Sequence, residues 1–292
     1  MKKLIALSFA ITSVIWAQAP ASKQVEVFGQ KIHYLEAGSG PNVILLHGLG
    51  ADSTNWAMNT SVLAKSFHVL VPDQIGFGES DKPLINYRVG TLVDFLDGFY
   101  KQVGIGKASI VGNSLGGWVA MAFTLAHPEK VERLVLVDSA GYSFEKLGTA
   151  KPSIETLDGL NPSTIAGCKA VLAMILANKS LATDQAAEHL LATHMKNGDG
   201  YTIERFIDSI QRGQDVVDGK LGAIHVPTLI VWGADDALTL PIGGKMLAKE
   251  IAGSELVMLD HCGHVPHFEC ASPFNAALLK FLNAGGQSTA SR

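Results

Sequence analysis

A serine, a histidine and an aspartate follow short apolar runs of the sequence, and together they could perform nucleophilic catalysis. Ser114 is the centre of a Gly-Asn-Ser-Leu-Gly sequence over 112–116, between an apolar run over 109–112 and a helical pattern over 115–127. A serine hydroxyl is a weak nucleophile at neutral pH, so it needs a base within hydrogen-bond reach and an acid that orients that base. A G-x-S-x-G pattern between a strand and a helix predicts a sharp turn that exposes the serine at the end of the strand.

Two residues further along the chain could supply the base and the acid. His264 lies in a Gly-flanked loop after the last apolar run and is the candidate base, while Asp236 ends the preceding run and is the candidate acid. The chain order Ser114, Asp236, His264 is the one expected for such a turn in a parallel sheet. Asp138 ends the run that follows Ser114 and is the alternative acid, because it could reach the same imidazole.

The neighbouring histidines also raise the question of a metal site. His261, His264 and His267 recur at a spacing of three. A zinc site would need a matching second motif with a carboxylate or a cysteine, and this spacing lacks one. We therefore expect no metal and no cofactor.

An anion that forms during acyl transfer needs N–H donors fixed in advance, each commonly worth about 10²–10³ in rate. The backbone N–H groups of Leu49 and Leu115 are the candidate donors, since both residues follow strands at the same end of the predicted sheet. His47 precedes Leu49 in a His-Gly-Leu-Gly sequence, and we interpret it as bracing this loop rather than as a second base.

The elements that must position these residues form an α/β pattern. Near-continuous apolar runs, typical of parallel strands covered on both faces, occupy 43–47, 69–72, 109–112, 134–138, 228–232 and 256–259. Residues 25–28 and 31–36 alternate instead and predict an antiparallel hairpin at one edge of the sheet. The sequence therefore predicts a doubly wound, mostly parallel sheet with an antiparallel N-terminal hairpin.

The strand pattern stops between Gly141 and about Lys220. Three helical stretches take its place, over 162–178, 184–196 and 202–212. We expect these helices to form an inserted cap over one end of the sheet and to line part of the ligand cavity. Its apolar residues, among them Val171 and Leu172, suit an apolar acyl or aryl group, although each one could also simply pack the cap onto the core.

These motifs resemble those of the α/β-hydrolase superfamily. The resemblance rests on His47-Gly48, on 72–80, on Gly-Asn-Ser-Leu-Gly-Gly over 112–117, on Trp-Gly-Ala-Asp-Asp over 232–236 and on Cys-Gly-His over 262–264. It runs in order from about residue 25 to residue 282. It implies that Ser114 is the nucleophile, His264 the base and Asp236 the acid, with a helical cap between the sixth and seventh strands.

The resemblance also limits the activities that we expect. Haloalkane dehalogenases and epoxide hydrolases carry Asp at the nucleophile position, where this chain has Ser114. A subgroup that cleaves C–C bonds of ring-fission products shares Gly-Asn-Ser and Cys-Gly-His. That subgroup commonly carries Trp where this chain has Val265, and we assign no residue of this chain to the arginine of that subgroup's cap. We therefore expect an esterase that forms an acyl-enzyme with a small-molecule ester; the alternatives are a C–C bond hydrolase and a non-catalytic binding protein on the same scaffold.

Composition and the N-terminus bear on partners and location. The 292 residues carry a net charge of -4 with no basic cluster, which excludes a nucleic-acid reader. Lys2 and Lys3, an apolar run over 4–16 and a small-residue pattern near Ala19 and Ala21 predict a signal peptide over 1–21, with a retained membrane anchor as the alternative. We expect a periplasmic or secreted protein with core segments over 22–140 and 221–285, a cap over 141–220 and a flexible tail over 286–292.

The cysteine content adds one further expectation. The three cysteines are Cys168, Cys262 and Cys270. An oxidising compartment permits a bridge between Cys262 and Cys270. Because Cys262 lies two residues from His264, where a bridge would restrain the loop, we expect three free thiols.

Overall fold

The computed structural model describes residues 19–284. The expected signal peptide, apart from its end, and the expected tail over 286–292 lie outside the described residues. None of the described helices is both long enough and apolar enough to cross a membrane.

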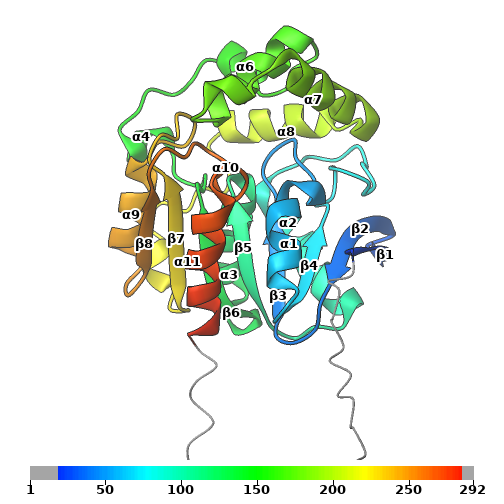
Figure 1. The fold of residues 1–292 in the computed structure, drawn as a ribbon, viewed down its shortest axis with the longest axis vertical. Helices are drawn as coiled ribbons and strands as arrows, with labels where there is room; N and C mark the ends of the chain where they lie inside the picture. Colours follow the sequence, from blue (N-terminus) through cyan, green and yellow to red (C-terminus); the bar gives the residue numbers. More distant parts are fainter. Residues whose placement is uncertain (1–18, 285–292) are drawn as a thin grey trace, which may run out of the picture.

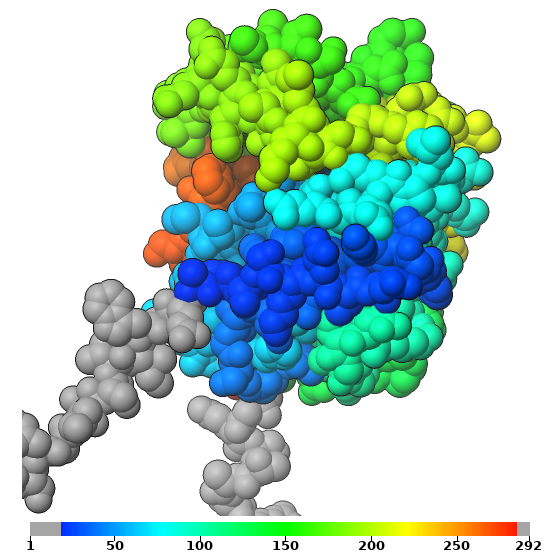
Figure 2. Space-filling model, turned by 90° about the vertical axis from the view of Figure 1, so that its right-hand side faces the viewer, coloured from blue at the N-terminus to red at the C-terminus, as the bar shows by residue number. Residues whose placement is uncertain are grey.

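An eight-stranded sheet forms the centre of the molecule, in the order β1-β2-β4-β3-β5-β6-β7-β8 (Figure 1). Its strands are β1 (Ala21–Val27), β2 (Gln30–Ala37), β3 (Asn42–Leu46), β4 (His68–Pro72), β5 (Ala108–Asn113), β6 (Val131–Val137), β7 (Thr228–Gly233) and β8 (Glu255–Leu259). All pairs from β4 to β8 are parallel, whereas β1 pairs antiparallel with β2, and β2 antiparallel with β4. The predicted sheet and its edge hairpin are confirmed, and Figure 2 shows this hairpin lying across one face of the molecule.

Helices cover both faces of the sheet because alternate strand residues point in opposite directions. Ile44 and Leu46 of β3 belong to a core shared with α2 and α3, while Val43 and Leu45 belong to a second core shared with α1 and α11. The helices outside the cap are α1 (Ala57–Leu63), α2 (Val89–Val103), α3 (Leu115–Ala126), α9 (Ile242–Glu250), α10 (Pro266–Glu269) and α11 (Ala271–Asn283). Burial on both faces explains why the strand sequences are continuously apolar.

A helical insertion between β6 and β7 lies over the end of the sheet where the parallel strands finish (Figure 1). It contains α4 (Phe144–Leu147), α5 (Ile154–Asp158), α6 (Ile165–Ile175), α7 (Asp184–Asn197) and α8 (Gly200–Gln211). The three longer helices match the predicted stretches. The sequence analysis missed α4 and α5, because a helix of one turn shows no periodicity; the Ser143 and Ser153 side chains cap them.

Candidate active site

Ser114 occupies a sharp turn between β5 and α3. Its φ is 55°, a left-handed conformation that is strained for a residue with a side chain. The Ser114 N–H donates to the Val137 carbonyl oxygen at 3.0 Å, and its own carbonyl accepts from the Trp118 N–H at 3.1 Å. The strained backbone is therefore held from the neighbouring strand and from the first turn of the helix.

The two glycines of the motif are needed because the backbone folds back on itself here. A Cβ added to Gly112 would lie 2.2 Å from the Gly116 carbonyl oxygen, and one added to Gly116 would lie 2.3 Å from the Leu46 carbonyl oxygen. Both distances are shorter than a real contact. The sequence interpretation of this motif as a tight turn with a strand before it and a helix after it is confirmed.

His264 and Asp236 meet at the same end of the sheet. The His264 Nδ1–H donates to Asp236 Oδ2 at 2.9 Å, and both side chains are almost fully buried. Asp236 follows β7 and His264 follows β8, which are parallel neighbours, so the two loops emerge side by side. Between the two candidate acids, the structure places Asp236 on the imidazole of His264. The adjacent Asp235 lies 4.0 Å from the exposed His261 instead.

The Asp236 carboxylate is held in its ionised form. Burial alone would raise the pKa of this carboxyl, but the His264 imidazole and the hydrogen bonds from Thr239 and Leu238 outweigh burial and lower the pKa well below its usual range. Asp236 Oδ1 accepts the Leu238 N–H at 2.7 Å and the Thr239 N–H at 3.1 Å. A negative charge is therefore fixed beside Nδ1 of His264, where it orients the imidazole.

Thr239 is a residue of this site that the sequence analysis missed. Its Oγ1 donates to Asp236 Oδ2 at 2.6 Å and lies 3.2 Å from His264 Nδ1. An Asp followed three residues later by Thr is a signal for a side-chain-capped turn, and it was available in the sequence.

Asp138 lies directly behind Asp236. Its Oδ1 accepts the Gly233 N–H at 2.9 Å, and its Oδ2 is buried without a partner among the described residues. Burial, together with the Asp236 charge, raises the pKa of Asp138 well above its usual value. Asp138 therefore accepts from the β7 backbone, whereas Asp236 takes the hydrogen bond of His264 and is its orienting acid.

The loop after β3 (residues 47–52, hereafter the His47 loop) is braced as expected. His47 Nε2 accepts the Gln74 N–H at 3.0 Å, so the ring proton is on Nδ1, which donates to the Gly48 carbonyl oxygen at 2.8 Å. The Gln74 side chain in turn donates to the His47 carbonyl oxygen. Both ring nitrogens of His47 therefore bind backbone groups, of Gln74 and of Gly48.

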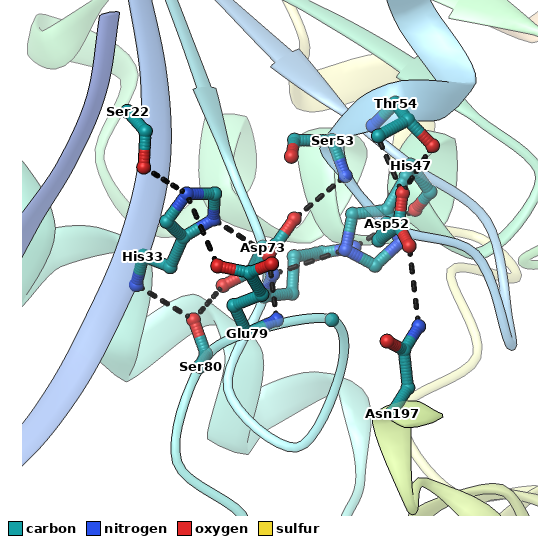
Figure 3. Close-up of polar contacts among 12 residues, drawn as sticks. Ser22, His33, His47, Asp52, Ser53, Thr54, Asp73, Glu79, Ser80 and Asn197 are labelled. Carbon is teal, nitrogen blue, oxygen red and sulfur yellow. Dashed lines mark hydrogen bonds and ion pairs between the residues drawn. The ribbon is translucent and has the colours of Figure 1, made fainter. Parts of the chain in front are cut away.

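Two buried side chains, His33 and Asp73, lie beside the His47 loop, and Asp73 binds Ser53, the residue that follows this loop (Figure 3). The His33 Nδ1–H donates to Asp73 Oδ2 at 2.7 Å, and Asp73 Oδ1 accepts the Ser53 N–H at 2.6 Å. Although burial opposes the charge, the His33 contact and backbone N–H donors lower the pKa of Asp73 to about 2. Asp73, the aspartate of the sequence over 72–80, therefore fixes the backbone at Ser53.

Ser114, His264, Leu49 and Leu115 all line one cavity of about 1060 Å³ beneath the cap. Apolar cap residues form much of its wall, including Leu157, Leu160, Val171, Leu172, Ile175, Leu176 and Leu190. The predicted nucleophile, base and candidate oxyanion donors are therefore brought to one place, under the predicted cap.

Asn113, next to Ser114, connects the two loops of the site. Its Nδ2 donates to the Val137 carbonyl oxygen at 3.2 Å and to the His264 carbonyl oxygen at 3.1 Å. The sequence analysis used Asn113 only as part of a resemblance. In the structure its amide ties the histidine backbone to the strand after the nucleophile.

The three histidines near the C-terminus do not group as metal ligands among the described residues. The buried His267 lies 2.7 Å from Asn55 through Nε2, and burial lowers the pKa of this imidazole to about 3. The one group of potential ligands in the described chain is Asp138, Asp236 and His264. The His264 and Asp236 atoms in that group are already hydrogen-bonded to each other.

The expectation of three free thiols is wrong. Cys262 and Cys270 form a disulfide, and only Cys168 is free among the described cysteines. The bridge forms because α10 turns the chain back after His264, which brings the two Cα atoms to 6.1 Å. The bridge restrains the loop around His264. We expected this restraint to disfavour a bridge, and that expectation is wrong.

Comparisons with known proteins agree with this geometry. Residues 41–271 match the family described as alpha/beta hydrolase fold. The 2-hydroxymuconate semialdehyde hydrolase of Pseudomonas sp. (strain CF600) is 30% identical over 276 residues, which cover 89% of this chain and 93% of that protein. The 2-hydroxy-6-oxononadienedioate/2-hydroxy-6-oxononatrienedioate hydrolase of Escherichia coli O81 (strain ED1a) is 34% identical over 86% of this chain and 91% of the relative.

Solved structures give the same result. The meta-cleavage product hydrolase from Pseudomonas fluorescens IP01 has a TM-score of 0.82 and 29% identity, covering 89% of this chain and 97% of that one. A membrane phospholipase A has a TM-score of 0.78 and 27% identity, over 90% of this chain and 86% of that one. The named relatives favour the C–C hydrolase alternative over the ester expectation. By its sequence match, its fold and its relatives, the chain belongs to the α/β-hydrolase family and is a serine hydrolase.

Proposed function

We propose that this protein hydrolyses neutral carboxylic esters of small, largely apolar acids through an acyl-enzyme on Ser114. The observation that carries the proposal is the apolar cavity above Ser114, which lacks a buried cation among the described residues. An ester of an apolar acid needs contact area for its acyl chain and polar groups only at the reacting carbonyl.

The proposed reaction uses Ser114, His264 and Asp236 in turn. Ser114 Oγ attacks the ester carbonyl carbon while His264 Nε2 takes its proton, and the N–H groups of Leu49 and Leu115 stabilise the oxyanion. The alcohol leaves with the proton that His264 returns. Water then attacks the acyl-enzyme by the same route and releases the acid.

The charge of the cavity favours this substrate class. The lysine and arginine among its described lining residues are Lys151 and Arg212. The Lys151 ammonium donates to the Gln211 carbonyl oxygen, and the 65% exposed Arg212 side chain pairs with Asp208. Both therefore lie at the solvent side with partners of their own.

A second candidate function is favoured by the comparisons. The named relatives act on products such as 2-hydroxymuconate semialdehyde, and C–C bond hydrolysis of a ring-fission dienoate would use the same serine hydrolase scaffold. A dienoate is an anion, and a buried carboxylate is costly unless a cation or several donors pair with it. His194 also lines the cavity, but its Nδ1 lies 3.1 Å from Asp199, so this imidazole already has a carboxylate partner.

A direct competition between substrates tests the proposal. Nitrophenyl esters of two-carbon to eight-carbon acids and a phenyl-substituted ring-fission dienoate are assayed with the same enzyme preparation. We expect kcat/KM for the best ester to exceed that for the dienoate by more than about tenfold, since burying one unpaired carboxylate costs more than the 1.4 kcal/mol to which tenfold corresponds. A higher kcat/KM for the dienoate would establish the second candidate.

Covalent labelling separates both enzymatic functions from a binding protein on the same scaffold. A fluorophosphonate reacts with a serine only where a base has activated it. We expect rapid labelling at Ser114 that Ser114→Ala and His264→Ala abolish. Wild-type protein that binds esters but resists the fluorophosphonate would be a binding protein.

We also propose that the protein acts outside the cytoplasm. The support is the N-terminal pattern of Lys2, Lys3 and an apolar run, together with the disulfide between Cys262 and Cys270. Structural disulfides are typical of oxidising compartments.

A further inference from the structure

Glu269 makes three hydrogen bonds with backbone groups from two separate parts of the chain. Its Oε2 accepts the Gly263 N–H at 2.8 Å and the Ala177 N–H at 3.0 Å, and its Oε1 accepts the Asn178 N–H at 2.6 Å. Gly263 precedes His264, whereas Ala177 and Asn178 follow the cap helix α6. One carboxylate thus joins the loop that carries His264 to the cap.

The same two segments also touch directly. The His264 N–H donates to the Ile175 carbonyl oxygen at 2.7 Å. A Cβ added to Gly263 would lie 2.4 Å from that same oxygen, so only glycine permits this approach. The last turn of α6 therefore lies against the backbone of the histidine, and Glu269 fixes the register of the two.

Glu269 itself is held firmly at the end of α10. Its backbone N–H donates to the Val265 carbonyl oxygen at 2.9 Å, and the next residue, Cys270, is bonded to Cys262. The carboxylate therefore acts from a fixed position on a closed loop that contains His264.

We propose that Glu269 is a positioning residue for His264, which it holds at the nucleophile by docking the histidine loop (residues 260–265) to the cap. This inference rests on the proposed role of His264 as the base for Ser114. Glu269 does not reach the cavity lining given above, so its effect passes through the backbone at Gly263 and at His264.

A carboxylate suits this position better than any neutral side chain. Two oxygens accept three N–H groups, and a charged acceptor makes each hydrogen bond stronger than a neutral one. Glutamine has one acceptor oxygen, and its NH₂ group would face an N–H donor on one of the two sides. Glu269→Gln therefore releases either the Asn178 contact or the shared contacts with Gly263 and Ala177.

The test compares Glu269→Gln with wild type in the full-length protein. The two readouts are the rate constant for labelling of Ser114 by a small fluorophosphonate and kcat and KM on a nitrophenyl ester. A displacement of about 1 Å in a catalytic group costs roughly 10² in rate. We expect labelling and kcat to fall together by about that factor, with KM changed less than the labelling rate.

Two controls make the outcome specific. Lys146→Gln removes another contact between cap and core, the 2.9 Å ion pair with Glu250 of α9, without touching the histidine loop or the His47 loop, and it should label at the wild-type rate. Wild type and His264→Ala are labelled in parallel. If the wild-type protein is not labelled, the proposed function is refuted. If the wild-type protein is labelled, His264→Ala is not, and Glu269→Gln is labelled at the wild-type rate, only the role of Glu269 is overturned.

A second pair of variants covers the case in which Glu269→Gln does not fold. Asn178→Pro removes the N–H that Oε1 accepts and leaves Glu269 in place, and the proline ring suits the φ of -78° at this position. Asn178→Ala removes only the side chain, which caps Ser180. We expect slower labelling in Asn178→Pro than in Asn178→Ala, and equal rates would overturn the proposal.

Discussion

Replacing Asp236 by asparagine should reverse the tautomer of His264. Asp236 Oδ1 accepts two backbone N–H groups, from Leu238 and Thr239, so the amide oxygen of the new side chain must stay there. Its NH₂ group then takes the place of Oδ2, 2.9 Å from His264 Nδ1. Two donors cannot face each other, so Nδ1 loses its proton and Nε2 gains one.

The consequence is a base that can no longer accept the Ser114 proton. The same substitution in a serine protease triad lowers kcat by about 10⁴, and we expect a loss of that order for Asp236→Asn. The assay is kcat on a nitrophenyl ester together with the labelling rate at Ser114, both normalised to the folded fraction by circular dichroism.

Asp138→Asn is the matched control, because the same reasoning predicts the opposite result. Asp138 Oδ1 accepts the Gly233 N–H, so an amide oxygen stays there and the NH₂ group points where Oδ2 lies, beside Asp236. The carboxyl group of Asp138, when it carries a proton, is also a donor at the position of Oδ2. We expect Asp138→Asn to lower kcat by less than about tenfold, which corresponds to the free energy of one or two ordinary hydrogen bonds. Near-normal turnover in Asp236→Asn with collapse in Asp138→Asn would refute the reasoning.

Three further predictions concern Asp138, the disulfide and the N-terminus. Burial and the Asp236 charge raise the pKa of Asp138 above its value in the unfolded chain, so the unfolding free energy of wild type should fall relative to Asp138→Asn as pH rises above about 4, by up to about 1.4 kcal/mol per pH unit; equal pH slopes in urea titrations would contradict a raised pKa of Asp138. Thiol counting in denaturant without reductant should find one thiol, from Cys168, and a Cys262→Ser/Cys270→Ser variant should lose about 2–3 kcal/mol of stability; three thiols in the exported protein would contradict the bridge. The exported protein should begin between Pro20 and Ser22, and an intact mass for the whole chain with Met1 would contradict signal cleavage.

The parallel core and the residues at its strand ends could be predicted from sequence because both depend on local patterns. Continuous apolar runs indicate strands buried on both faces, and parallel strands end at one edge, so Ser114, Asp236 and His264 had to come close together. The boundaries of the three longer cap helices were predicted to within a few residues; Thr183 caps α7 as expected, whereas the α6 cap, Thr164, was not recognised.

The contacts between distant segments could not be predicted in this way. Glu269 binds backbone groups whose approach depends on how α6 and α10 pack, and the Thr239 hydroxyl reaches His264 only because the loops after β7 and β8 lie side by side. The disulfide required knowing that the chain turns back after His264, which a short helix with little periodicity does not reveal. The chain order was enough to prefer Asp236 to Asp138, but it did not reveal that Asp138 accepts the Gly233 N–H instead.

The hydrogen bonds that the cap makes with His264 and Glu269 use main-chain groups of the cap, and this has a consequence for how the protein could diversify. The Ile175 carbonyl and the N–H groups of Ala177 and Asn178 are present whatever side chains the cap carries there. Thr228 of β7 lies beside Leu134 of β6 although the whole insertion separates them, so the core strands pair directly on either side of the insertion. New cap sequences, and even longer ones, can therefore be exchanged onto the same core while the docking contacts persist, so selectivity can change without rebuilding the catalytic end of the sheet.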